Sequence, residues 1–181
     1  MASSETFSSE ITRLDLRRRA YRGAKMSASI WLVTGSLSMA AAAQDLSPLQ
    51  TVELLHKAMA QADAATAAAL LHADYRGVSL QGASEQRHVY VETRDKAVRD
   101  IAALHAGDWR IRFLKTSTLI DSNGMAHVWA RYVFYYKGAP NHCGYESYGL
   151  FHDRGTWKII SFADTDNVLK GRSVDEVCPE E

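Results

Sequence analysis

The sequence has 181 residues, 46% of them hydrophobic, so it is long enough for one folded domain and too apolar for a globally disordered chain. The formal net charge is zero, but six basic and three acidic residues fall within the first 43, which leaves a mildly acidic remainder. A mildly acidic domain without a basic stripe matches the nucleic-acid backbone poorly. Nucleic acid is therefore not expected as a partner.

Residues 1–43 have the pattern of an export signal. The basic stretch Arg17–Lys25 precedes an apolar run that ends in small residues at Ala41–Ala43. Cleavage there would leave Gln44 as the new N-terminus of a periplasmic or secreted protein, by either the general or the twin-arginine route. The alternative is an amphipathic helix of the domain or a retained anchor. The apolar run is too short for a hydrocarbon core of ~30 Å, so no membrane span is expected in the mature form.

Three helices are predicted after the signal. Ser47, Pro48 and Gln50 form a capping box with proline at the first helical position, followed by apolar residues at helical spacing up to Met59. Asp63 is the expected N-cap of a second, alanine-rich helix that ends near Leu71. A third helix is expected from about Thr93 to His105.

The second half of the chain changes to a period of two, which is typical of β-strands. A short strand is expected at Tyr75–Leu80 before the third helix. Four longer ones follow, separated by turn-forming residues, at Trp109–Ile120, Met125–Lys137, His142–His152 and Thr156–Thr165. Helices followed by an antiparallel meander predict an α+β domain with three N-terminal helices packed on a curved, cone-shaped sheet. The domain is predicted over residues 44–167, with a polar C-terminal tail over 168–181.

The order of elements and several strand motifs resemble the nuclear transport factor 2-like, or SnoaL-like, superfamily, whose fold is also described as cystatin-like. The motifs are similar to those of its exported bacterial lumazine-binding branch. They lie at Ala126–Phe134, His142–Gly144, Gly155–Ile160 and Ala163–Thr165. The resemblance implies a pocket between helices and sheet. The superfamily includes isomerases, dehydratases, hydrolases and non-catalytic binding domains, so the fold does not settle the function.

Acidic and aromatic side chains supply the candidate chemistry of that pocket. Glu146 and Asp164 are candidate catalytic bases, with His142 as a proton shuttle. A second set, Tyr132, Tyr148 and Asp74, is predicted to line a ligand pocket for a small apolar or heteroaromatic molecule. The alternatives are that the tyrosines are ordinary sheet residues, that His142 bonds a turn, and that Asp164 and Asp166 anchor a turn.

The register of the last two strands decides whether the two acids meet. A two-residue loop at Arg154–Gly155 would place Asp164 opposite Tyr145, with Glu146 on the other face. A three-residue loop would place Asp164 opposite Gly144 and on the face of Glu146. Both registers remain open at this stage.

Two cysteines, Cys143 and Cys178, lie in the predicted mature chain. A disulfide between them and two unrelated thiols are both open alternatives, since an oxidising compartment only permits the bridge. The sequence contains neither a metal-ligand spacing nor a phosphate-binding loop, so no metal and no cofactor are predicted.

One face of the strand Met125–Lys137 carries His127, Trp129, Arg131, Val133 and Tyr135. This aromatic face predicts a homodimer through the sheet. Three functions are therefore weighed: an exported small-molecule-binding domain, an enzyme of the isomerase, dehydratase or hydrolase kind, and a dimeric accessory module of an envelope complex. A buried Glu146 or Asp164 beside a tyrosine would favour the enzyme. An apolar pocket without convergent polar groups would favour the binding domain, and an interior filled by side chains would favour the accessory module.

Overall fold

The structure is a computed structural model that describes residues 46–82 and 87–179. The predicted signal peptide over residues 1–43 lies outside the described residues.

Three helices form where the sequence predicts them. Helix α1 (Pro48–Ala60) begins with the expected capping box. The Ser47 side chain accepts a hydrogen bond from the Gln50 backbone N–H, and the Gln50 side chain accepts one from the Ser47 backbone N–H. Helix α2 (Ala64–Leu70) is capped by Asp63. Helix α3 (Arg94–Ala102) is capped by Thr93 and is slightly shorter than expected.

Six strands form one curved sheet in the order β2-β1-β6-β5-β4-β3, in which only β1 and β6 are parallel neighbours. Their bounds are β1 Leu71–Gln81, β2 His88–Thr93, β3 Trp109–Ile120, β4 Met125–Tyr136, β5 Ala139–Asp153 and β6 Thr156–Val168. The predicted four-strand meander is confirmed, and β1 is longer than expected. Strand β2 was missed because it lies at the sheet edge, where Val89 and Val91 are 62% and 59% exposed and give no core-facing pattern.

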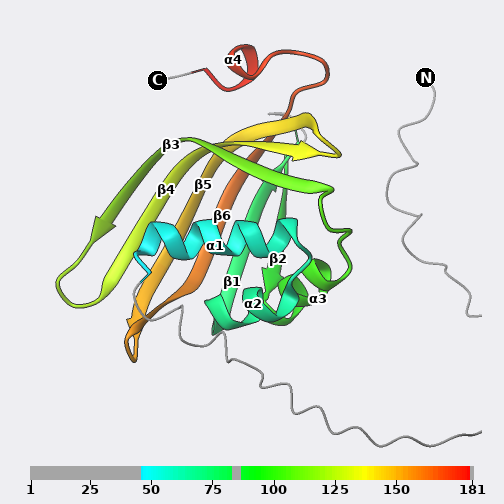
Figure 1. The fold of residues 1–181 in the computed structure, drawn as a ribbon. Coiled ribbons are helices and arrows are strands. Elements are labelled where there is room, and N and C mark those ends of the chain that lie inside the picture. The colour runs from blue at the N-terminus through cyan, green and yellow to red at the C-terminus, as the bar shows by residue number, and fades with distance from the viewer. Residues whose placement is uncertain (1–45, 83–86, 180–181) are drawn as a thin grey trace, which may run out of the picture. The chain divides into compact units, whose positions relative to one another are not determined.

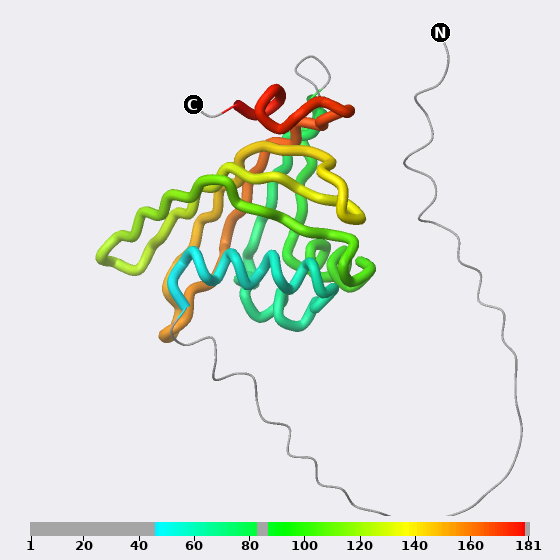
Figure 2. The backbone as a smooth tube through the Cα atoms, turned by 45° about the horizontal axis from the view of Figure 1, so that its top comes forward, coloured from blue at the N-terminus to red at the C-terminus, as the bar shows by residue number. Residues whose placement is uncertain are grey.

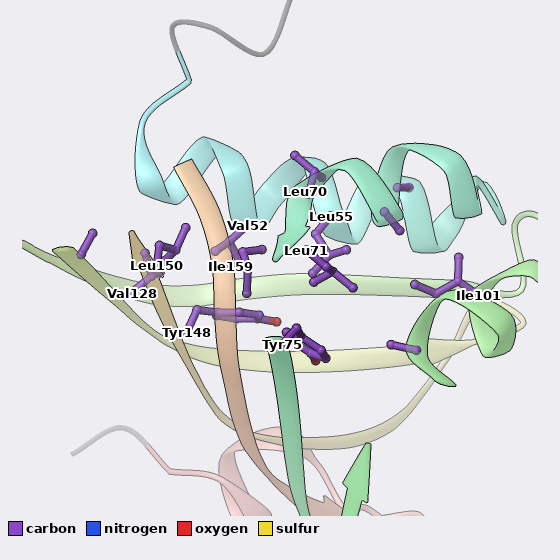
Figure 3. Packing of buried hydrophobic residues seen from close by; sticks show 14 residues of the cluster. Val52, Leu55, Leu70, Leu71, Tyr75, Ile101, Val128, Tyr148, Leu150 and Ile159 are labelled. Atoms are coloured by element: carbon purple, nitrogen blue, oxygen red, sulfur yellow. The ribbon is translucent and has the colours of Figure 1, made fainter. Parts of the chain in front are cut away.

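Helices α1, α2 and α3 cover one face of the sheet (Figure 1). The core lies between them: Val52 and Leu55 of α1 point toward Leu150 and Ile159 of the sheet, with Tyr148 among them (Figure 3). The predicted α+β fold class, with helices packed against a curved antiparallel-rich sheet, is confirmed.

The C-terminal residues pack on the opposite face of the sheet (Figures 1 and 2). A disulfide joins Cys143 of β5 to Cys178, which follows the short helix α4 (Val174–Val177). Leu169 and Cys178 are buried against Val133 in a second, smaller apolar cluster. Apolar packing and one disulfide thus hold the segment over 168–178 to the sheet.

Candidate functional site

A cavity of about 460 Å³ lies between the inner face of the sheet and helices α1 and α3. Its volume falls within the range of ordinary small-molecule sites. Glu146, Asp164, His142, Tyr132 and Tyr148, all singled out from the sequence, line it. The interior is therefore hollow, and polar groups converge in it.

Glu146 and Asp164 face each other across strands β5 and β6, in neither of the two registers considered from the sequence. The loop has two residues, and Asp153 pairs with Thr156 beside it. A bulge then inserts one extra residue, because Leu150 pairs with Ile159 while Gly149 pairs with Ser161. This shift places Asp164 opposite Glu146 and turns both side chains toward the cavity.

Glu146 is the centre of a buried polar cluster with His56 of α1 and Tyr148 of β5. The Tyr148 hydroxyl lies 3.2 Å from Oε2 of Glu146 and 2.7 Å from Nε2 of His56, and His56 Nε2 is 3.4 Å from the same carboxyl oxygen. Burial, reinforced by the nearby charge of Asp164, raises the pKa of Glu146 to about 8. Burial lowers the pKa of His56 to about 3, so that imidazole is neutral.

Asp164 lies beside Tyr132, whose hydroxyl is 3.4 Å from Oδ2 of Asp164 and donates to the Thr165 carbonyl at 3.1 Å. Burial raises the pKa of Asp164 to about 6. Its Oδ1 atom is buried and has no hydrogen-bond partner among the described residues. Leaving a buried carboxylate oxygen without a donor costs free energy, most of all when the carboxyl group is ionised.

The close approach of Thr165 explains the glycine in the His142–Gly144 motif. A Cβ atom on Gly144 would lie 1.8 Å from the Thr165 carbonyl oxygen. The Tyr145 backbone N–H donates to the Thr165 side chain at 3.1 Å. Gly144 therefore lets β6 bend against β5 next to Asp164.

His142 lies at another part of the cavity wall. Its ring stacks on Phe134 at 4.5 Å, and its Nδ1 is 3.0 Å from the Asn141 side chain and 3.8 Å from Asp166. Burial lowers its pKa. The structure thus brings His142 near Tyr132 and Asp166, and no hydrogen bond or ion pair joins it to Glu146 within the described residues.

Asp74 does not join the cavity. Its side chain is 81% exposed on β1 and lies 3.7 Å from His72. It precedes Tyr75, whose side chain is the one that turns inward. Sequence position near the end of α2 favoured Asp74, but strand alternation gives the inward place to Tyr75.

Two cavity features were not foreseen from the sequence. His56 lies on the cavity side of α1 but was not among the predicted site residues. The Tyr75 hydroxyl donates to Glu92 of β2 at 2.9 Å, and burial raises the pKa of that glutamate. Both depend on contacts between residues distant in the sequence.

The outer face of β4 is only partly free. His127 and Trp129 are exposed, and Trp129 stacks on Tyr145 at 5.5 Å. Arg131 and Val133, expected on an open dimer surface, are buried beneath the C-terminal segment, where Arg131 donates to the Cys178 carbonyl. The chain itself thus covers half of the predicted interface.

Within residues 46–82 and 87–179, no group of three His, Cys, Asp or Glu side chains is arranged to hold a metal ion. None of the helices in those ranges has the length and apolar character needed to cross a bilayer.

The domain has the nuclear transport factor 2-like, cystatin-like fold. A Novosphingobium aromaticivorans protein described in those terms matches with a TM-score of 0.53 and 10% identity, over 70% of this chain and 82% of its own. A proposed dehydratase of the same family from Streptomyces avermitilis gives 0.50 and 14% over 64% and 90%. The C. elegans CaMKII association domain gives 0.51 and 12% over 64% and 90%.

No protein-family model and no curated protein matches the chain. At these identities the likeness to solved structures establishes the fold alone, and the function must be argued from the cavity.

Proposed function

We propose that the domain binds a small molecule in the cavity and transfers protons on it, with Asp164 as base and Glu146 as acid. The observation that carries the proposal is the pair of facing carboxyl groups, whose pKa values are about 6 and about 8. Near pH 7, Asp164 is then mostly ionised and Glu146 mostly protonated. Environments that separate two carboxyl pKa values in this way assign one group as base and the other as acid.

The neighbouring side chains support these roles. When Glu146 is protonated it can donate to the Tyr148 hydroxyl, which in turn donates to the neutral His56 Nε2; when it is ionised, Tyr148 donates to it instead. Tyr148 can therefore hydrogen-bond to Glu146 in both of its protonation states. Tyr132 holds Asp164 from the other side.

Proton removal by Asp164 with donation by Glu146 fits an isomerisation or an elimination. The apolar and aromatic walls suit a substrate with an apolar or heteroaromatic body. A proposed dehydratase among the structural neighbours has a compatible reaction, although its identity of 14% supports only the fold. Convergence of polar groups favours this function over binding without chemistry.

A proton-abstraction probe tests the proposal without knowledge of the substrate. 5-Nitrobenzisoxazole opens to a coloured phenolate when a base removes its ring proton. We expect the intact domain to accelerate this opening, with a rate that rises with pH as Asp164 ionises around pH 6. Asp164→Asn should lower kcat/KM about 100-fold, while Asp74→Asn, an exposed acid outside the cavity, should not. An equal rate in Asp164→Asn and the parent would refute the proposal.

We further propose that the protein is exported and processed before Gln44. The Cys143–Cys178 disulfide supports this location, because such bonds persist in oxidising compartments. Mass spectrometry of the protein from the periplasmic fraction should give a chain that starts at Gln44, and a full-length chain in the cytosol would contradict the idea.

The remaining open part of the outer face supports a homodimer. Trp129, Leu119 and Met125 are 45%, 69% and 62% exposed there, which is unusual for a solvated sheet. One structural neighbour is an association domain. Sedimentation should show a dimer for the parent and a monomer for Trp129→Glu; a monomer for both would end the proposal.

A further inference from the structure

The cavity is lined by acids without a basic counterpart. Five acidic side chains line it, and none of its lining residues is Lys or Arg. Asp100 is paired with Lys96 at 2.5 Å, which leaves Glu92, Glu146, Asp164 and Asp166 with no ion pair to Lys or Arg in the part of the chain that the structure describes. An anionic ligand would find no cation here.

The two cavity histidines do not supply positive charge either. Burial lowers the pKa of His56 to about 3. Burial also lowers the pKa of His142, whose Nδ1 lies within hydrogen-bond distance of the Asn141 side-chain oxygen. The negative charge of the cavity is therefore left for a ligand to balance.

Two neighbouring carboxyl groups of the cavity wall, Asp164 and Asp166, are placed to hold a cation. Oδ1 of Asp164 and Oδ1 of Asp166 are both buried without a hydrogen-bond partner among the described residues. The two acids are two residues apart on β6, so their side chains share the inner face of the sheet. Burying such carboxyl groups in their ionised form costs free energy that the positive charge of a ligand would recover.

Aromatic rings form much of the remaining wall. Phe162 lies on β6 with the two aspartates, and Tyr75 lies on the neighbouring strand β1. Tyr132 and Phe134 lie on β4, from which the Tyr132 hydroxyl approaches Asp164. Ring faces attract organic cations, and aromatic rings beside carboxylates are the usual environment of bound ammonium groups. A bare metal ion fits less well, since no three-ligand metal group occurs in the described ranges.

We infer that the ligand of this cavity is an organic cation, with its ammonium group at Asp164 and Asp166 and its apolar body against the aromatic rings. The inference rests on the proposed function only in that a small molecule occupies the cavity. Beyond the proposed function, the ligand is assigned a positive charge, and Asp164 and Asp166 are assigned to bind it.

Binding of a cation should be linked to protonation. A positive charge favours the ionised carboxyl forms, so it lowers the pKa values of Asp164 and Glu146 from about 6 and about 8 and releases protons. Affinity for a permanently charged ligand should therefore rise between pH 6 and pH 8. The titratable groups that line the cavity with Glu146 are His56 of α1, Tyr75 of β1, Tyr90 and Glu92 of β2, Asp100 of α3, Tyr132 of β4, His142 and Tyr148 of β5, and Asp164 and Asp166 of β6.

Benzyltrimethylammonium and its neutral carbon isostere, neopentylbenzene, separate charge from shape. NMR titration of the intact domain at pH 8 should give an affinity for the ammonium compound at least about tenfold higher than for the isostere, which corresponds to 1.4 kcal/mol. Calorimetry at pH 7 in two buffers of different ionisation enthalpy should detect proton release. Asp164→Asn should abolish the preference, and Asp74→Asn, matched in chemistry but outside the cavity, should keep it.

The preference of the unmodified protein for the ammonium compound over its isostere tests the inference even if a variant fails to fold. An isostere that binds as tightly as the ammonium compound, or no binding of the ammonium compound, would overturn the inference. The benzisoxazole assay tests the proposed function separately, because its probe is neutral. Activity in that assay without a preference for the ammonium compound would support proton transfer and refute the cationic ligand.

Discussion

Glu146 should make the stability of the domain fall as the pH rises. Its side chain is 2% exposed, and its pKa moves from the ordinary 4.5 to about 8. Between these values the unfolded chain has released the proton while the folded domain still holds it, so raising the pH favours unfolding. Each pH unit contributes about 1.4 kcal/mol, which gives about 4 kcal/mol between pH 5 and pH 8.

Urea unfolding of the parent and Glu146→Gln at a series of pH values isolates this contribution. The variant keeps the shape but cannot ionise, so the free energy of unfolding of the parent relative to the variant should decrease by about 4 kcal/mol from pH 5 to pH 8. Asp164 titrates in both proteins and largely cancels. Glu53→Gln, an exposed change on α1, is the matched control and should show no such trend. A flat difference for Glu146→Gln would refute the buried, protonated carboxyl.

Two further changes test the frame around the site. Gly144→Ala would place a Cβ 1.8 Å from the Thr165 carbonyl oxygen and should lower the free energy of unfolding by more than about 3 kcal/mol. In the control Gly149→Ala, on the same strand, the new Cβ approaches the movable hydroxyl of Ser161, so the loss should be clearly smaller. Equal losses in the two variants would contradict the close approach at Gly144. Cys178→Ser removes the bond to Cys143 across 35 residues and should cost about 3–4 kcal/mol; reduction of the parent should reproduce the loss, and an unchanged urea midpoint in both would show that the bond does not hold the C-terminal segment.

Local signals in the sequence were sufficient for most of the fold. The capping box at Ser47 and the cap at Asp63 act within one helical turn, so the residues themselves specify where α1 and α2 begin. The long strands alternate because one face is buried, and that alternation is visible in the sequence. Strand β2 turns Tyr90 and Glu92 inward and leaves its valines exposed, so no apolar alternation identified it.

Contacts between residues that are distant in the sequence could not be predicted, because the recognisable patterns are local. His56 is separated from Tyr148 by 92 residues, and nothing near it in the sequence indicates that an acid will lie beside it. The C-terminal segment appeared polar because its apolar residues, Leu169 among them, are few and widely spaced. The disulfide was left open because spacing alone does not determine whether the two cysteines meet.

The feature with the largest consequence that the sequence did not reveal is the bulge between β5 and β6. It lies where the pairing changes from Leu150 with Ile159 to Gly149 with Ser161. Without the extra residue, Asp164 would pair with Tyr145 and point to the outer face. With it, Ile159 before the bulge and Phe162 after it both face the interior, so β6 contributes apolar packing near the helices and acidic groups farther along. The facing carboxyl groups, and with them the acid–base and cation-binding proposals, therefore depend on one inserted residue whose presence no local pattern signals.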